Sequence, residues 1–268
     1  MKNHIQIIAL ALAGLAVTAT AKAGTKPLKA LLITGGCCHD YATQKEILKK
    51  GIEARANIIV DQIHTNNNTV KPDLPIYGLP EYAKGYDVVI HDECAAEISD
   101  DTIVKGVLAP HQAGIPGVNL HCAMHSYRIG NPNEKAETLG TPHSQWFEYL
   151  GLQSSGHGPQ KPIEITYVNK EHPITKTLAD WTTINEELYN NVKMFDTAHP
   201  LAKGKQGSDD TVVTWTNDYN GTKVFSTTIG HNNATVEDAR YLDLVTRGVL
   251  WACGKLDEKG VIAEGYAK

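Results

Sequence analysis

Two imidazoles and a thiol are crowded into one short segment of the chain, Asn119-Leu120-His121-Cys122-Ala123-Met124-His125. The apolar run before it, 113–118, is typical of a buried strand, and the residues after it can begin a helix. A sharp turn from strand to helix is where α/β enzymes expose a reactive side chain above the sheet. The segment therefore predicts a catalytic turn, at which either His121 or Cys122 faces the substrate.

Three histidines follow predicted strands that lie far apart in the sequence: His39, His121 and His231. Ligands of open α/β sheets bind beyond the carboxyl ends of the strands, so we expect these three imidazoles to converge in space. Three neutral imidazoles can bind a divalent metal such as zinc or manganese, with a carboxylate or a water completing the shell. They can equally act as general acids and bases near neutral pH. Both interpretations stay open from the sequence.

Other residues are expected to line the same pocket. Two glycines after the first strand would let the backbone approach a ligand closely, and no G-x-G-x-x-G or G-K-[ST] motif follows them, so we expect no nucleotide cofactor. A carboxylate at position 187 could serve as a base or a metal ligand, although a solvated turn there is an equally good interpretation. The predicted additional residues are Gly35, Gly36, Asp40, His125, Glu187 and Tyr189.

Elements that could position these residues alternate along the first half of the chain. The predicted strands and helices are 28–33, 42–54, 57–63, 86–90, 100–113 and 118–120. Short apolar strands alternating with helices predict a mostly parallel sheet covered by helices on both faces. In the second half, 163–168 and 211–216 alternate like half-exposed strands, and Asn220-Gly221 favours a hairpin joining 211–216 to 223–228. Thr235 to Asp238 resembles a capping box for a last helix.

The N-terminal segment is predicted to lie outside this domain. Lys2, a short apolar run and Ala21-Lys22-Ala23 are typical of a cleaved secretory signal peptide over residues 1–23, with a membrane anchor as the alternative. We therefore expect a single α/β domain over 24–268 in a periplasmic or secreted protein, free of the membrane after cleavage. His172-Pro173 and His199-Pro200 are interpreted as turns, and His157 is placed on a flexible loop.

Charge and cysteine content narrow the possible partners. The formal net charge is −5 and no basic cluster occurs, which argues against nucleic acid and anionic membranes as partners and favours a small polar ligand. The five cysteines are an odd number and lack the spacing of a disulfide framework or a zinc knuckle. At least one thiol is therefore expected to be free.

Several of these motifs, in this order, resemble the ThuA-like (trehalose utilisation) family. They are Thr34-Gly35-Gly36 with His39-Asp40, Asn119 to Ala123, His172-Pro173-Ile174, Glu187-Leu188-Tyr189, and Lys223-Val224-Phe225 with Gly230-His231. The resemblance spans nearly the whole predicted domain. It implies a flavodoxin-like, class I glutamine amidotransferase-like fold, with added antiparallel strands in the C-terminal half. It also implies a role in sugar catabolism, with disaccharides oxidised to keto forms as substrates.

The resemblance also bears on the catalytic turn. Related amidotransferases carry a cysteine nucleophile at the centre of G-x-C-x-G, and on this chain the centre falls on His121, between Asn119 and Ala123. Centring the motif on Cys122 would place Leu120 and Met124 where the tight turn needs glycine. We therefore expect His121 at the tip and Cys122 beneath it, although Asn119 departs from the usual glycine of the family.

Three functions are compatible with the sequence. The first is an enzyme acting on keto-sugars or related glycosides through a histidine-rich pocket, by isomerisation, epimerisation or elimination. The second is a cysteine-dependent amidohydrolase with Cys122 as nucleophile. The third is a non-catalytic sugar-binding module in which aromatic side chains stack on sugar rings, the candidates being Trp146, Tyr149, Trp181 and Trp215.

Overall fold

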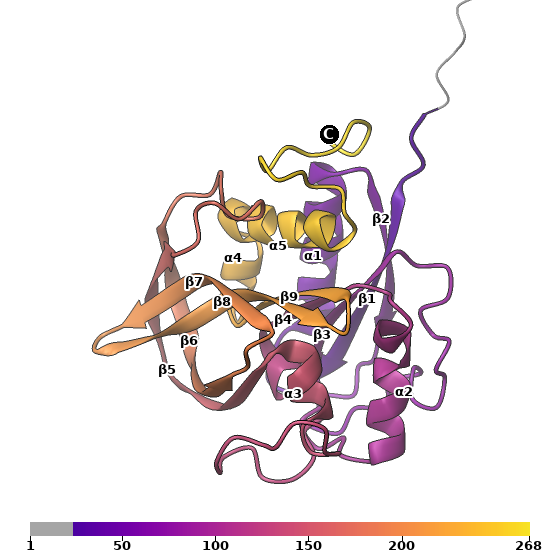
Figure 1. The fold of residues 1–268 in the computed structure, drawn as a ribbon, viewed down its shortest axis with the longest axis vertical. Helices are drawn as coiled ribbons and strands as arrows, with labels where there is room; N and C mark the ends of the chain where they lie inside the picture. The colour runs from indigo at the N-terminus through magenta and orange to yellow at the C-terminus, as the bar shows by residue number, and fades with distance from the viewer. Residues whose placement is uncertain (1–23) are drawn as a thin grey trace, which may run out of the picture.

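A mixed β-sheet forms the centre of the molecule in the computed structural model, which describes residues 24–268 (Figure 1). The strands are β1 (Leu28–Gly36), β2 (Ile58–His64), β3 (Val88–Cys94), β4 (Gly117–Leu120), β5 (Leu152–Tyr167), β6 (Trp181–Met194), β7 (Ala198–Gln206), β8 (Asp209–Tyr219) and β9 (Thr222–Thr227). The helices are α1 (Tyr41–Arg55), α2 (Asp101–Gln112), the 3₁₀ helix η1 (His121–His125), α3 (Gln145–Leu150), α4 (Asn233–Val236) and α5 (Ala239–Ala252).

The order of the strands divides the sheet into two parts. In the described residues it is β2-β1-β3-β4-β9-β8-β7-β5-β6. The first five strands are parallel, and from β9 onward each neighbouring pair is antiparallel. The predicted fold is confirmed: a parallel core covered by helices, with antiparallel strands added in the C-terminal half. The predicted hairpin is also present, with Asn217 opposite Val224 across the turn.

Helices cover both faces of the parallel part. Helices α1 and α5 pack on one face, and α2 and α3 lie on the other (Figure 1). Each face has its own apolar core, because the strands of the parallel part carry apolar residues toward both sides. Leu32 and Val118 belong to the first core, while Leu31 and Val89 belong to the second. The sheet thus forms a rigid platform whose carboxyl edge is free to carry a site.

The antiparallel part folds back toward that edge. Strand β6 is the last strand of the sheet, yet it contacts β8 and α4 as well as its neighbour β5. Register shifts interrupt the pairing of β5 with β6 between Gln153 and Glu164. Such irregularities bend a strand and increase its twist. The curvature brings β6 to the ends of β4 and β9, which are distant from it in the strand order.

Several local predictions are wrong for identifiable reasons. The last helix, α5, has Asp238 as its N-cap, whose side chain accepts the backbone N–H of Arg240, so the predicted capping box at Thr235 is not formed. Residues 155–159 belong to the bulged strand β5 instead of a flexible loop, and His199-Pro200 lie in β7 instead of a turn. The turn at His172-Pro173 is present.

The aromatic residues proposed to stack on sugars are core residues. Trp146, Tyr149 and Trp215 are 1%, 0% and 0% exposed, and Trp181 is 7% exposed. The indole N–H of Trp146 donates to Ala123 O, and that of Trp215 donates to Leu150 O. These rings stabilise the two cores and are not available to a ligand.

The predicted signal peptide, residues 1–23, lies outside the described residues. From residue 24 onward, no helix combines the length and apolar character required to cross a membrane.

Candidate active site

The turn after β1 places His39 at the carboxyl edge of the sheet. Gly36 has φ +96°, and a Cβ there would overlap the carbonyl of Cys94 on the paired strand β3. Only glycine fits this combination of conformation and close approach. The chain then runs through His39 to Asp40, whose side chain caps α1 by accepting the backbone N–H of Thr43. The close backbone approach that was predicted for the two glycines is therefore made, at Gly36, to the neighbouring strand β3. The role of Gly36 is structural.

The turn after β4 has the strained backbone expected of a catalytic tip. His121 has φ +42°, which residues other than glycine adopt uncommonly. Its Nδ1–H donates to the backbone carbonyl of Thr228 at 2.6 Å, which orients the ring and leaves Nε2 facing the carboxylate of Glu187. Asn119, the departure noted in the sequence of this turn, donates from its side-chain amide to Ser226 Oγ at 3.1 Å and is fully buried. The turn accommodates Asn119 because β9 offers that partner.

Strand β6 supplies a carboxylate between the histidines. Glu187 Oε2 lies 3.5 Å from His121 Nε2 and 3.5 Å from His157 Nε2, and Glu187 Oε1 lies 3.3 Å from His231 Nδ1. The amide of Gln160 also donates to Oε1 at 3.2 Å. Glu187 is only 5% exposed, so the solvated turn considered for this position is wrong.

The preceding residue holds the loop that carries His231. Glu186 is fully buried, and its carboxylate accepts the backbone N–H groups of Gly230, His231 and Asn232 at 3.3, 3.0 and 3.3 Å. Gly230 has φ +133°, and a Cβ there would come within 2.7 Å of the Tyr241 hydroxyl. Three convergent N–H groups on one carboxylate fix the loop, and with it the His231 ring.

The three predicted histidines do come together. The His39 ring centroid lies 4.7 Å from that of His121 and 4.8 Å from that of His231, and the last two are 5.5 Å apart. Convergence follows because β1, β4 and β9 are parallel and end at the same edge of the sheet.

Cys122 lies behind the tip. It is buried, and its Sγ is 3.0 Å from His39 Nε2. Contact with Cys94 and burial raise the pKa of the Cys122 thiol well above its ordinary value. The thiol is therefore protonated at neutral pH, unlike the thiolate of an activated cysteine nucleophile.

Further rings lie on the side of β5 and β6. His125 stacks on Tyr189 with centroids 4.3 Å apart and an interplanar angle of 7°, and its Nε2 is 3.0 Å from Ser154 Oγ. His157 stacks on the same tyrosine at 5.8 Å. Both His125 and Tyr189 are thus placed near the site as predicted, but as a packed pair beside Glu187.

Electrostatics distinguish two of the central histidines. Burial, with the nearby His121 and His231, lowers the pKa of His39 to about 3. Contact with the Glu187 carboxylate raises the pKa of His231. Burial opposes ionisation of Glu187, but His121 and His231 outweigh it and hold its pKa well below the ordinary value. The site at neutral pH therefore contains a carboxylate, a neutral His39 and a His231 that retains a proton more readily than usual.

Three groups of side chains in the described residues lie close enough to hold a metal ion, and one of them, Cys37, Cys38 and Cys94, has two of its sulfurs in a disulfide. The other two groups contain histidines. His121, Glu187 and His231 offer ligand atoms within 4.8 Å of one another, and so do His39, His121 and Cys122. The three histidines predicted as metal ligands do not form one group: His121 belongs to both groups, His231 to the first and His39 to the second. Within the described residues, His121 Nε2 and His231 Nδ1 are buried atoms that make no hydrogen bond. A buried nitrogen without a hydrogen-bond partner destabilises the folded protein unless a ligand or an ion contacts it.

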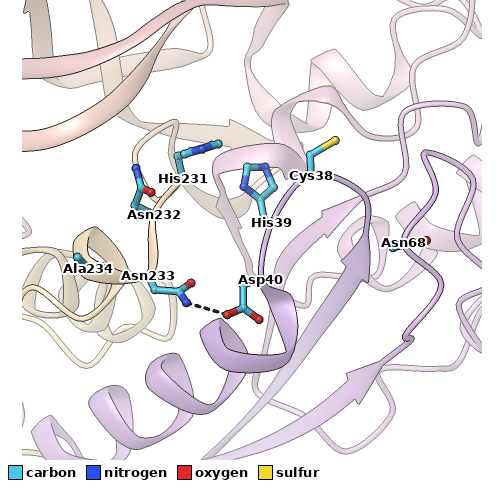
Figure 2. A pocket seen from close by; sticks show the side chains of 8 residues that line it. All are labelled: Cys38, His39, Asp40, Asn68, His231, Asn232, Asn233 and Ala234. Atoms are coloured by element: carbon cyan, nitrogen blue, oxygen red, sulfur yellow. Dashed lines mark hydrogen bonds between the residues drawn. The ribbon is translucent and has the colours of Figure 1, made fainter.

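An open pocket of about 600 Å³ lies over His39 and His231 (Figure 2). Its other lining residues are mostly polar and include Asp40, Asn68, Asn232 and Asn233. Asn233 donates to Asp40 Oδ2 at 2.8 Å, which joins α4 to the start of α1 across the pocket floor. The surface offers several hydrogen-bonding groups to a polar ligand.

The sequence matches the family model of ThuA, described as trehalose utilisation, over residues 29–252. The chain belongs to the ThuA family. A ThuA-like protein from Parabacteroides merdae superposes with a TM-score of 0.63 at 21% identity, covering 91% of this chain and 97% of that one. A ThuA-like protein from Bacteroides uniformis gives 0.58 at 16%, covering 88% and 95%. No curated protein sequence matches the chain.

The amidotransferase-like fold of this ThuA protein is also seen in a solved structure outside the family. A GMP synthase protein from Thermoplasma acidophilum superposes with a TM-score of 0.51 at 11% identity, covering 85% of this chain and 94% of that one. Identities this low show the fold alone, so the chemistry of the site has to be argued from its own residues.

Three site features of this ThuA protein were missed from the sequence. His157 contacts Glu187, Glu186 anchors the His231 loop, and Cys37 and Cys38 form a disulfide between adjacent residues. The adjacency of two cysteines could have signalled the disulfide. Nothing in the local sequence signals the other two, because their partners come from distant segments.

Proposed function

We propose that this ThuA protein is a carbohydrate-modifying enzyme that acts on keto-sugars or related glycosides by moving a proton beside the carbonyl group. The observation that carries the proposal is the convergence of three imidazoles beside the buried carboxylate of Glu187, two of which, His39 and His231, line an open polar pocket. The family description, trehalose utilisation, supports a carbohydrate as the substrate class. A binding module would not need ionisable groups with opposed pKa shifts at this position.

A divalent cation, zinc or manganese, fits the innermost residues. His121 Nε2 and His231 Nδ1 are buried without hydrogen bonds, and both face the ionised Glu187. Two imidazoles and a carboxylate with room for further ligands are a common catalytic donor set. His121, His231 and Glu187 would hold the ion, and a bound ion would polarise a sugar carbonyl.

The remaining side chains have roles that follow from their positions. His39 lines the pocket and is neutral at neutral pH, so its ring can accept a proton from a sugar carbon or hydroxyl. Asp40, Asn232 and Asn233 can hydrogen-bond to sugar hydroxyls. Glu186 holds the loop that carries His231 and touches no ligand-facing surface.

The metal part of the proposal is tested by elemental analysis and titration. Protein purified without chelator or affinity tag is analysed for metal, and zinc or manganese is then titrated into the apo-protein. We expect one site in the wild type and a large loss of affinity in Glu187→Gln. Glu164→Gln, an exposed glutamate on β5, is the matched control and should bind as the wild type does. Equal affinity in all three proteins would exclude this metal site.

The catalytic part is tested by solvent exchange. Trehalose and its keto derivative are incubated with the enzyme in deuterium oxide, and deuterium at the carbon beside the ketone is followed by NMR. We expect incorporation or conversion of the keto-sugar, and its loss in His39→Ala. General acid–base groups typically contribute about 10²–10⁴-fold in rate. Keto-sugars that neither exchange nor react would contradict the proposal.

The same residues support proton transfer without a metal. The pKa of His39 is lowered while that of His231 is raised, which separates a base from an acid within one cluster. If the titration detects no metal while exchange still occurs, this acid–base function accounts for the activity.

A second candidate function is hydrolysis through Cys122. The observation that favours it is the 3.0 Å contact between Cys122 Sγ and His39 Nε2, which is the spacing of a cysteine–histidine pair. The raised pKa of the thiol and its burial argue against it. Rapid, ligand-protected alkylation of Cys122, with loss of turnover in Cys122→Ala and not in His121→Ala, would establish it.

We further propose that the enzyme works outside the cytoplasm after residues 1–23 are removed. The support is the charged start, the short apolar run and Ala21-Lys22-Ala23. The mature protein is expected to begin at Gly24 by intact mass. An uncleaved protein in the cytoplasmic fraction would contradict this.

A further inference from the structure

Three sulfur atoms lie together beside the candidate active site. Cys37 and Cys38 are joined by a disulfide, with their Cα atoms 3.7 Å apart. Cys94 is a free, buried cysteine, and its Sγ lies 3.5 Å from Cys37 Sγ. A free thiol in van der Waals contact with a disulfide sulfur is placed as the attacking group of a thiol–disulfide exchange.

The sheet itself brings these cysteines together. Strand β1 pairs with β3 in parallel, and Gly36 is the register partner of Cys94. Because Gly36 has no Cβ, its backbone lies against the carbonyl of Cys94, and the next residue, Cys37, turns its sulfur toward the Cys94 thiol. The contact is therefore built into a paired position of two core strands.

The two disulfide cysteines differ in exposure and conformation. Cys37 is half-buried, whereas Cys38 is exposed and lines the open pocket (Figure 2). Cys38 also has φ +83°, a region that non-glycine residues seldom occupy. Breaking the bond between Cys37 and Cys38 would let the backbone at Cys38 leave this region, which favours release of Cys38.

We propose that Cys37, Cys38 and Cys94 form a thiol–disulfide exchange site that presents Cys38 to low-molecular-weight thiols and disulfides at the pocket. In the exchange, the Cys94 thiolate attacks Cys37 Sγ, a Cys37–Cys94 bond forms and the Cys37–Cys38 bond breaks. Cys94 is oxidised, Cys38 leaves as the reduced thiolate, and the proton lost by Cys94 is taken up by Cys38 through solvent. No external oxidant or reductant is consumed.

The released thiolate can then react with a small disulfide. With glutathione disulfide, Cys38 attacks one sulfur, a mixed disulfide forms on Cys38, and one glutathione thiolate leaves. Because His39 directly follows Cys38, a group attached to Cys38 would sit beside the His39 ring at the entrance of the pocket. The site is therefore a position for covalent thiol modification next to the candidate active site.

The exchange is tested by trapping and mapping. Full-length native protein, without reductant, is treated with N-ethylmaleimide at mildly alkaline pH, denatured and digested with trypsin. We expect peptide 30–45, labelled on Cys38, to be cross-linked through Cys37 to peptide 85–105, which contains Cys94. In Cys94→Ser the label on Cys38 should fall by about tenfold or more, since the attacking thiol is gone. Cys253→Ser, which changes a distant free cysteine, is the control and should keep the wild-type pattern.

Several results would overturn the proposal. One is a wild-type peptide 30–45 that keeps its internal disulfide and stays unlabelled throughout. Another is equal labelling of Cys38 in the wild type and Cys94→Ser. If Cys94→Ser fails to fold, the presence or absence of the cross-linked peptide in the wild type decides the question. Incubation with glutathione disulfide should add one glutathione at Cys38, and addition at Cys253 alone would also count against the site.

Discussion

A buried histidine pair behind the sheet should make the stability of this ThuA protein depend on pH. His111 on α2 is fully buried and stacks on Tyr149 with ring centroids 4.4 Å apart. Its Nδ1 lies 2.8 Å from the carbonyl of Ile115, which can only accept, so Nδ1 carries the proton. Its Nε2 is left as the acceptor facing His91 Nε2 at 3.1 Å. A second proton on His111 would put a positive charge in a fully buried position beside another imidazole.

The size of the effect follows from the pKa of His111, which burial and the neighbouring His91 lower from 6.5 to about 3. Between these two values the unfolded chain binds a proton at this position and the folded protein does not. The contribution of His111 to the free energy of unfolding is therefore fully present above pH 6.5 and is lost progressively as the pH decreases toward 3. Each pH unit in this window costs about 1.4 kcal/mol, so His111 alone should cost about 2 kcal/mol by pH 5.

The assay is urea denaturation of the wild type and His111→Gln at several pH values. At pH 7 the variant should be the less stable protein, because it loses the stacking on Tyr149. Between pH 6.5 and 5 its free energy of unfolding should fall by about 2 kcal/mol less than that of the wild type. His143→Gln, at an exposed position, controls for the loss of one histidine. Parallel curves for the wild type and His111→Gln would refute the reasoning.

Three further outcomes are expected from the geometry. Iodoacetamide should label Cys122 far more slowly in the native than in the unfolded protein, because contact with Cys94 and burial raise the pKa of its thiol; equal rates would show an exposed thiolate. Gly36→Ala should lower the free energy of unfolding in urea by about 2–5 kcal/mol, because Gly36 has a positive φ and a Cβ there would overlap the β3 backbone. The control is Gly106→Ala in α2, where a Cβ meets open space, and this change should be neutral or stabilising. Glu186→Ala leaves one buried and two part-buried backbone N–H groups without their acceptor, and should lower the free energy of unfolding by about 3 kcal/mol and weaken metal binding. An unchanged metal affinity would show that the loop does not support the site.

The fold could be predicted from the sequence because its signals are local. Apolar runs that end in glycine or a polar cap mark β1, β3 and α2, and their alternation indicates a parallel sheet. The bulged strand β5 is predicted only over 163–168, because its first half contains glycine and proline and lacks any apolar alternation. Its place in the sheet comes from pairing with β6, which is a long-range property.

The candidate site could be predicted only where strand ends carry its residues. His39, His121 and His231 follow β1, β4 and β9, so the topology of parallel strands was enough to bring them together. The sequence alone does not decide between a buried catalytic carboxylate and a solvated turn at Glu187. Its burial depends on the curvature of β6 toward the parallel strands, which is a long-range property. His157 is on the bulged part of β5, where the side-chain direction cannot be counted from the sequence period.

In the turn after β4, two neighbouring residues with different chemistry, His121 and Cys122, lie in different surroundings. A positive φ at a non-glycine residue persists only where the surroundings determine it, and His121 is held by the Thr228 carbonyl on one side and faces Glu187 on the other. The next residue, Cys122, turns back into the protein and lies in the buried cluster with Cys94. The imidazole of His121 therefore contacts the carboxylate of Glu187, and the thiol of Cys122 lies in a separate buried cluster. This arrangement favours proton or metal chemistry in the pocket and places sulfur exchange at its rim, which is why the two proposals can be tested independently.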